Sequence, residues 1–283
     1  MQLVHGARAA RAKVREDVAV QIEVAGMIRA AYRDLTGEVL VGKRAVEIGA
    51  GQTLLLARAI AVDNEVVATD LDTFVDGIDL TGYWTMLRGN GAKRTIKTIG
   101  RKVLGIDRRS LRELGRQLGA TRLPRPAARR MDAVSLELPD ASVDLVYSVN
   151  VFEHLPDPAA VWRDAKRVLR PGGCLFTHFN PYTSDRGCHD LRIIRGEHDA
   201  TGYWPHLRAL ARSLVRNSSF LNQLSLAEWN RMMNAELPGG LVEFLRDEGN
   251  RAELDRLRSA GELAEFSDDE LLVHTIVSAW QKP

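Results

Sequence analysis

The chain has 283 residues, long for one domain and short for two, so we expect one core with elaborations. Its 45% hydrophobic and 27% charged residues are ordinary for a globular protein. The sequence has no run of about 18 apolar residues, which excludes a membrane span. Basic residues interrupt the N-terminal stretch where a signal peptide needs an apolar core, and two cysteines without metal spacing indicate a reduced compartment. We therefore expect a cytoplasmic protein, with attachment to a membrane surface left open.

The net charge of +2 hides an uneven distribution. Residues 88–130 contain 14 Lys or Arg and only two acids, a local charge of +12. Such a segment suggests an anionic partner, which could be a phosphate-bearing substrate, a membrane surface or nucleic acid. A solvated pair of basic helices explains the same composition equally well.

The first part of the chain resembles half of a nucleotide-binding sheet. Apolar residues at helical spacing predict a helix over 7–35. An apolar strand over 44–48 leads into a Gly-rich turn, a helix over 53–61 and a buried strand over 65–69 that closes on Asp70. This order of strand, Gly loop, helix, strand and acid is typical of such sheets.

The middle of the chain interrupts this pattern with helical stretches over 93–104 and 109–118. The core resumes at residues 131–133. The later elements are predicted in this order: a strand over 143–148, a helix over 158–169, a sharp turn over Arg170–Gly173, a strand over 174–179, an irregular segment over 180–224, a helix over 226–235, a strand over 241–246, a charged helix near 251–263 and a strand over 272–280.

We interpret residues 1–283 as a single domain. Its parts are N-terminal helices over 1–36, core segments over 37–76, 131–180 and 225–283, a basic insertion over 77–130 and a cap over 181–224.

The turn Gly49-Ala50-Gly51 is a candidate cofactor loop, because glycines let the backbone turn tightly and approach a ligand closely. Nicotinamide enzymes have a third glycine where this chain has Leu54. The acid before the turn, Glu47, suits a cationic ligand and would be misplaced beside a pyrophosphate. S-adenosylmethionine carries a sulfonium and an ammonium and no phosphate, so the loop favours this cofactor over a dinucleotide.

Two further acids occur in the order that this cofactor requires. Asp70, followed by Leu71, ends the second strand, where a carboxylate can accept both ribose hydroxyls. Asp132, followed by Ala133, lies where an adenine amino group needs an acceptor. Each acid alone could be an ordinary strand-end residue, but three in this order with a Gly loop predict a cofactor site.

Six motifs together resemble class I S-adenosylmethionine-dependent methyltransferases, and most closely the subgroup of ubiquinone, natural-product and sugar O-methyltransferases. They occur in the order of that family: Glu47–Gly51, Ala68–Asp70, Met131–Ala133, Val143–Tyr147, Phe152–Leu155 and Leu169–Gly173. The resemblance implies an α/β fold, a Rossmann-like sheet of seven mostly parallel strands with an antiparallel last strand, with helical insertions forming a substrate cap. One departure is Thr53, where many members have a third glycine.

The segment after the strand over 143–148, the fourth strand of the family's sheet, is the first candidate for catalysis. His154 could remove a proton from the acceptor, because an imidazole with an ordinary pKa near ~6.5 is mostly neutral at working pH. It could equally pack and cap the next helix. Relatives of the ubiquinone type carry a Glu that helps to hold magnesium where this chain has Asn150, which we count among the cofactor-binding residues. Because an amide has no charge, a divalent ion is conceivable but we predict no metal.

The segment after the fifth strand supplies the second cluster. His178 and His189 are alternative bases, and Asp190 and Arg192 could bind the substrate, the arginine through an anionic group. Tyr203, Trp204 and His206 could stack on a sugar or flat ring, or form the small core of a cap.

Our leading hypothesis is an O-methyltransferase of a small or medium polar acceptor, with a saccharide or glycolipid hydroxyl as the preferred class. The main rival is a nucleic-acid methyltransferase that grips RNA phosphates with residues 88–130, and a third class is a cofactor-binding regulatory protein without turnover. Asn180-Pro181-Tyr182 echoes the motif of DNA and RNA amino-methyltransferases, but it follows the fifth strand rather than the fourth and lacks the second proline, so we interpret it as a coincidence. A steep loss of RNA or DNA affinity with salt would distinguish the nucleic-acid enzyme. The acceptor atom and the oligomeric state are open.

Overall fold

The structure is a computed structural model that describes residues 2–74, 83–84, 86–88, 91–199, 201–217 and 219–283. Residues 75–76 of the predicted core lie outside the described residues. So do parts of the predicted basic insertion (77–82, 85, 89 and 90) and two residues of the predicted cap (200 and 218).

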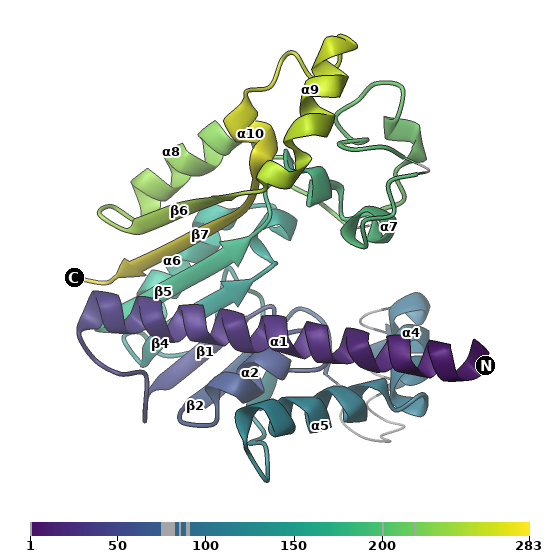
Figure 1. The fold of residues 1–283 in the computed structure, drawn as a ribbon. Helices are drawn as coiled ribbons and strands as arrows, with labels where there is room; N and C mark the ends of the chain where they lie inside the picture. Colours follow the sequence, from purple (N-terminus) through teal and green to yellow (C-terminus); the bar gives the residue numbers. More distant parts are fainter. Residues whose placement is uncertain (1, 75–82, 85, 89–90, 200, 218) are drawn as a thin grey trace. The chain divides into compact units, whose positions relative to one another are not determined.

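Seven strands form one sheet in the order β3-β2-β1-β4-β5-β7-β6 (Figure 1). Their bounds are β1 (Arg44–Ile48), β2 (Glu65–Asp70), β3 (Ala127–Arg130), β4 (Val143–Val149), β5 (Leu169–Phe179), β6 (Leu241–Arg246) and β7 (Val273–Gln281). β2 pairs in parallel with both β1 and β3, whereas β6 and β7 are antiparallel. The predicted α/β sheet of seven strands with an antiparallel last strand is therefore confirmed.

The chain divides into two compact units. Unit one comprises Met1–Tyr147, Asp164–Leu175 and Gln281–Pro283, and unit two comprises Ser148–Arg163 and Phe176–Trp280. The helices are α1 (Gln2–Thr36), α2 (Leu55–Ile60), α4 (Ala92–Val103), α5 (Ile106–Leu118), α6 (Pro158–Val168), α7 (Leu191–Ile194), α8 (Leu226–Glu236), α9 (Arg251–Ser259) and α10 (Asp268–Leu272). Short 3-10 turns are η1 (Phe152–His154), η2 (Asp185–Cys188), η3 (Arg212–Leu214) and η4 (Glu248–Asn250).

In unit one, the long helix α1 packs against α2 and α5 (Figure 1). Its inward face is apolar, with Ile28 and Tyr32 buried. Every residue of β1 after Arg44 is also buried, which is typical of a central parallel strand with both faces covered. Within the described residues, none of the helices is both long and apolar enough to cross a membrane.

The predicted sharp turn over Arg170–Gly173 is wrong, because β5 already begins at Leu169. The backbone N–H of Gly172 donates to the carbonyl of Lys282 at 2.8 Å, and the N–H of Lys282 donates to the carbonyl of Gly173 at 2.8 Å. A Cβ on Gly173 would lie 2.9 Å from the Arg170 carbonyl oxygen and 3.1 Å from that of Asp144. Gly173 thus allows close approach of neighbouring backbone, whereas Gly172 takes a left-handed conformation with a φ of 78° inside the strand.

The predicted boundary between the basic insertion and the core also differs from the structure. We predicted that the core resumes at residues 131–133, whereas β3 is the exposed segment Ala127–Arg130, inside the predicted basic insertion. Its Ala-Ala-Arg-Arg sequence has no strand pattern, and an edge strand rich in arginine resists pairing with other chains. Residues 131–133 instead follow the strand and enter a turn in which Asp132 and Ser135 form an isolated bridge.

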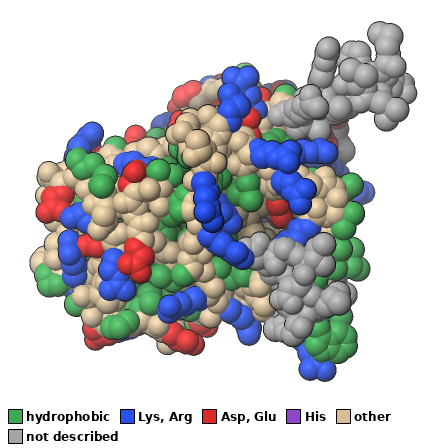
Figure 2. Space-filling view, turned by 90° about the horizontal axis from the view of Figure 1, so that it is seen from below, with side chains coloured by type: hydrophobic (Ala, Val, Ile, Leu, Met, Phe, Trp, Pro, Cys, Tyr) green, Lys and Arg blue, Asp and Glu red, His purple; other side chains and the backbone are tan. Residues whose placement is uncertain are grey.

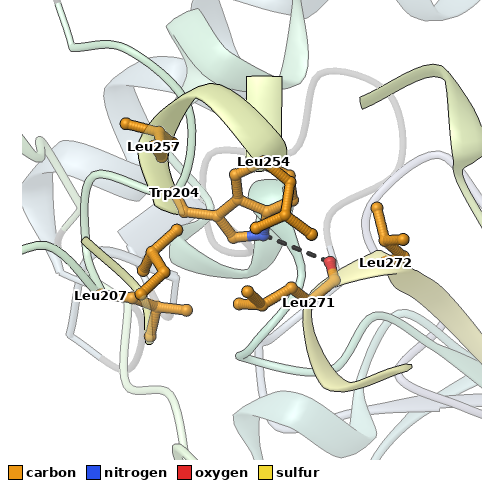
Figure 3. Packing of buried hydrophobic residues seen from close by; sticks show 7 residues of the cluster. Trp204, Leu207, Leu254, Leu257, Leu271 and Leu272 are labelled. Atoms are coloured by element: carbon orange, nitrogen blue, oxygen red, sulfur yellow. Dashed lines mark hydrogen bonds between the residues drawn. The ribbon is translucent and has the colours of Figure 1, made fainter. Parts of the chain in front are cut away.

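Unit two has its own apolar core around Trp204, shown in Figure 3. Leucines from α9 and α10 surround the indole, and its Nε1–H donates to the backbone carbonyl of Leu271 at 3.2 Å. A second group of rings packs Phe152 against Trp162 at 5.0 Å and Phe179 against Trp229 at 4.4 Å between ring centroids. The segment predicted as a cap is therefore built on a fixed apolar base.

Candidate functional site

The Gly loop at the end of β1 in unit one is held by its neighbour β2. The N–H groups of Gly49 and Ala50 both donate to the carbonyl oxygen of Thr69, at 2.8 and 3.0 Å. Gly49 and Gly51 have φ angles of 76° and 61°, a left-handed region that suits glycine. A Cβ on Gly51 would meet nothing within 4 Å, so glycine serves the backbone turn there and leaves open space beside the loop.

Asp70 fixes the same loop through its side chain. One carboxylate oxygen accepts the N–H of Gly51 at 3.0 Å, and the other accepts the N–H of Asp72 at 2.9 Å. The carboxylate is thereby oriented at the C-terminal edge of the parallel strands, where α/β sheets bind ligands.

Glu47 is a buried acid behind the loop. Burial raises the pKa of its carboxyl to about 8, while the hydroxyl of Tyr147, which donates to it at 3.3 Å, lowers the pKa in part. At neutral pH the carboxyl is mostly protonated, and a cation placed beside it would favour the charged form. Such a site can bind an ammonium group with release of a proton.

Apolar side chains flank the acids of this site. Leu71 directly follows Asp70 and Val134 follows Ala133, and both leucine and valine side chains are exposed. Asp132 holds this turn, since its carboxylate accepts the N–H of Val134 at 3.1 Å. Two exposed apolar side chains beside two acids suit a flat ring with polar edges, such as a nucleoside. Val134 was missed from the sequence.

In unit two, Glu153, His154 and His189 form a cluster. The His154 and His189 rings meet edge to face, 4.6 Å apart between centroids. The Nε2 atom of His189 lies 3.5 Å from a carboxylate oxygen of Glu153. The structure thus brings together two of the three histidines predicted as bases, from segments 35 positions apart in the sequence.

Core packing and an asparagine position this cluster. Phe152 anchors η1 by stacking on Trp162 and on Phe179. The side-chain amide of Asn222 donates to the carbonyls of Phe152 and Leu155, at 2.8 and 3.2 Å. Its backbone N–H donates to the carbonyl of Glu153 at 3.0 Å. Asn222 was missed because a lone asparagine carries no signal of its distant partner.

The protonation of the cluster is set by burial. Burial raises the pKa of Glu153 to about 8, and nearby backbone amides offset only part of the rise. Burial, and then the neighbouring His154, lower the pKa of His189 to about 4. At neutral pH the glutamic acid is therefore mostly protonated and His189 is neutral.

The tautomer of His154 is fixed by a hydrogen bond. Its Nδ1 atom lies 2.8 Å from the carbonyl oxygen of Phe220. Because a carbonyl only accepts, Nδ1 carries the proton in the neutral ring, and Nε2 keeps a free lone pair. This nitrogen can accept a proton from a hydroxyl or bind a metal ion.

The cluster could also hold a metal. Glu153, His154 and His189 each offer one ligand atom, and these atoms lie within 4.8 Å of one another. One carboxylate and two imidazoles are ligands that divalent transition metals accept. The carboxyl of Glu153 and the imidazoles of His154 and His189 can therefore either exchange protons or bind a metal ion.

The other predicted residues of unit two have mainly structural contacts. Asp190 caps α7 and binds the Arg192 guanidinium at 2.6 Å, which holds the pKa of the carboxyl well below its usual range. Arg192 also donates to the carbonyl of Leu214 at 2.7 Å. The carbonyl of His178 accepts the N–H of Asn150 at 2.8 Å. His178 lies on β5, and Asn150 directly follows β4 in a left-handed conformation.

The predicted aromatic group is divided between core and surface. Trp204 and His206 are buried, and Nε2 of His206 bonds to the carbonyl of Tyr182 at 2.7 Å. Only Tyr203 is partly exposed, and it stacks on His198 at 3.8 Å between ring centroids. Trp204 and His206 therefore pack in the core of unit two. Their burial leaves no surface on which a substrate ring could stack.

Residues 88–177 match the family described as methyltransferase domain. The matched residues make up about a third of the chain. The match includes Asp132, Glu153 and His154, whereas the Gly loop lies before it. This family match confirms the predicted resemblance to S-adenosylmethionine-dependent methyltransferases.

Curated proteins similar to parts of this chain are methyltransferases as well. An uncharacterized methyltransferase of Mycobacteroides abscessus is 28% identical over 139 residues, 47% of this chain and 54% of that protein. A ubiquinone biosynthesis O-methyltransferase of Xanthomonas oryzae pv. oryzae is 33% identical over 96 residues, 34% of this chain and 36% of that protein. The chain thus spans about half or less of the length of these relatives.

A solved S-adenosylmethionine-dependent methyltransferase of Mesorhizobium loti aligns with 88% of this chain and 95% of its own. The identity is 17% and the TM-score 0.42. The fold of the methyltransferase domain is assigned from its own strand order.

Proposed function

We propose that this protein transfers the methyl group of S-adenosylmethionine to a hydroxyl oxygen of a small or medium polar acceptor, with a saccharide or glycolipid as the preferred class. The observation that carries the oxygen acceptor is the tautomer of His154. A base with a free Nε2 lone pair suits a hydroxyl, which must lose a proton as its oxygen becomes an ether.

The residues of unit one fit this cofactor. Asp70 would bind the ribose hydroxyls, and Glu47 would accept the ammonium group. The exposed Leu71 and Val134 would flank the adenine, with Asp132 near its amino edge. Gly51, where a Cβ would meet nothing within 4 Å, would leave room for the methionine part. Asn150, which lies in unit two, stays a predicted cofactor contact. S-adenosylmethionine supplies an electrophilic methyl group when bound.

In unit two, His154 would act as the general base. The acceptor hydroxyl gives its proton to Nε2 as its oxygen takes the methyl group, and the imidazolium is stabilised by the Phe220 carbonyl. His189, which is neutral at working pH, and the protonated Glu153 place no competing charge beside that nitrogen. His178 remains the alternative base, and Asp190, Arg192 and Tyr203 remain predicted acceptor contacts.

The cofactor assignment is tested by calorimetry with Asp70→Ala. Loss of charge-assisted hydrogen bonds should weaken S-adenosylmethionine binding by about 1–3 kcal/mol. Asp63→Ala is the matched control, since Asp63 lies before β2 and pairs with Arg29. Equal affinity of wild type and Asp70→Ala would refute the ribose assignment.

The base is tested with a labelled methyl group and a panel of saccharide, glycolipid and phenolic acceptors. His154→Ala should lower turnover by about 10²- to 10⁴-fold with little change in cofactor affinity. Normal turnover in this variant would move the base to His189 or His178. Activity that is abolished by a chelator and restored by a divalent ion would instead make the Glu153, His154 and His189 cluster a metal site.

A further inference from the structure

Helix α4 has the reverse of the usual amphipathic arrangement. Ile96, Ile99 and Val103 share one face at helical spacing and are exposed by 68%, 37% and 80%. Thr98, on the other side, and Thr95, next to the stripe, are buried. A helix in a globular protein normally turns its apolar stripe toward the core. Among the described residues, none covers the exposed stripe of α4, which is typical of a surface that binds a partner or a membrane.

The charge of this helix identifies the kind of cover. The segment 91–104 contains five Lys or Arg and no acid. A protein partner of ordinary composition would match the apolar stripe but not the positive charge of the segment. An exposed apolar stripe on a segment rich in Lys and Arg and free of acids is instead typical of helices that lie in the headgroup region of anionic membranes.

The residues before α4 continue the same character. Trp84 is 56% exposed and Leu87 is also exposed, and the Arg88 guanidinium lies 4.9 Å from the centre of the Trp84 ring. Tryptophan is enriched at the membrane interface, because its ring has an apolar body and a polar N–H. Figure 2 shows Lys and Arg side chains distributed over the face drawn there, with hydrophobic side chains exposed among them.

We propose that α4, together with Trp84, docks on an anionic lipid bilayer. Ile96, Ile99 and Val103 would enter the boundary of headgroups and acyl chains, and the net positive charge of the segment 91–104 would attract the lipid phosphates. This selects the membrane among the anionic partners that the composition left open, because nucleic acid phosphates would match the cations but not the apolar stripe.

The same helix borders a cavity of unit one. Ile99, Lys102 and Val103 line a space of about 710 Å³ together with Gln52 to Leu54, which directly follow the Gly loop. A docked α4 would therefore place this cavity beside the membrane surface. That consequence, access for a lipid-borne acceptor, rests on the proposed function, whereas docking itself does not.

The test is flotation of the full chain with vesicles of phosphatidylcholine alone or with about 30 mol% phosphatidylglycerol. Wild type should bind only the anionic vesicles, and binding should fall steeply with salt. The double variant I96S/V103S should bind about ten- to a hundredfold less, since it removes two apolar side chains from the bilayer. The control V39S/V41S removes two valines of unit one that are 67% and 56% exposed and should bind like wild type.

Trp84 provides a direct readout of contact. The other four tryptophans, Trp162, Trp204, Trp229 and Trp280, are buried. Brominated lipids should therefore quench the fluorescence of wild type, and Trp84→Phe should abolish this quenching. Because the readout needs no methyl acceptor, it can fail or succeed independently of the proposed enzyme activity.

Four outcomes would overturn docking. One is a wild-type protein that does not bind anionic vesicles at low salt. Another is an equal loss of vesicle binding in I96S/V103S and in V39S/V41S. A stable dimer that I96S/V103S dissociates, or RNA binding that it abolishes without any vesicle binding, would assign the face to a second copy or to nucleic acid.

Discussion

Substitution of the buried acid Glu47 by glutamine should change stability and cofactor affinity in opposite directions. In the folded protein, burial raises the pKa of this carboxyl to about 8 from an ordinary 4.5. Between these two pH values the folded state keeps a proton that the unfolded state loses. The free energy of unfolding therefore falls as pH rises through this window, and Glu47→Gln removes that fall because glutamine does not titrate.

The size of the effect follows from the window. Each pKa unit corresponds to about 1.36 kcal/mol, so the roughly 2.5 units between pH 4.5 and 7 amount to about 3 kcal/mol. The amide oxygen of glutamine can still accept the Tyr147 hydroxyl, which keeps the main polar contact. The gain of Glu47→Gln over wild type should thus grow from near zero at pH 4.5 to about 3 kcal/mol at pH 7.

Urea unfolding of both proteins at pH 4.5, 6 and 7 measures this gain. Calorimetry of S-adenosylmethionine binding at pH 7, in two buffers with different ionisation enthalpies, measures the accompanying proton. Wild type should release close to one proton as Glu47 ionises beside the ammonium group, and Glu47→Gln should release none and bind about 1–3 kcal/mol more weakly. Equal proton release by both proteins, or a stability difference that does not change with pH, would refute the reasoning.

Two further substitutions test how unit two is built, with urea unfolding as the measurement. Trp204→Ala should lower the free energy of unfolding by about 3–5 kcal/mol, because it empties a core site, whereas the exposed Trp84→Ala should change it by less than about 0.5 kcal/mol. Gly187→Ala should be destabilising by more than about 1 kcal/mol, since its Cβ would lie 2.2 Å from the Tyr182 carbonyl oxygen. Its control Gly100→Ala, in α4 with nothing within 4 Å, should be neutral or stabilising; a reversed order of the two would contradict this packing.

Elements with strong periodic or apolar patterns were predictable from the sequence. The strand over 241–246 has its predicted bounds, and the predicted helix over 226–235 is α8, whose Ser225 and Glu228 form a capping box. The failures at β3 and at Arg170–Gly173 share a cause. In both, pairing with a distant segment decides the conformation: β2 fixes β3, and Lys282 fixes the start of β5. Local propensity cannot report such partners.

The candidate site divides in the same way. The positions of Glu47 and Asp70 beside the Gly loop could be predicted, because Glu47 lies near the end of β1 and Asp70 ends β2, which pairs with β1. The pairing of His154 with His189 could not, because only the folded irregular segment brings their rings together. Likewise Tyr203, Trp204 and His206 look alike in sequence, and tertiary burial alone separates the packing residues from the exposed one.

Two buried carboxyls, Glu47 and Glu153, link the site to stability. Glu47 lies near the end of β1, and Glu153 lies in η1, which follows β4. Burial raises the pKa of each carboxyl to about 8. Both acids therefore oppose folding at neutral pH, an expense that a merely structural position would avoid with glutamine or leucine. Retaining an ionisable group where it destabilises the protein is understandable if ionisation is used: by a cationic cofactor at Glu47, and by a proton or metal ion at Glu153. On this argument, ionisation of Glu47 and Glu153 is part of the proposed function and explains why ionisable side chains occupy these buried positions.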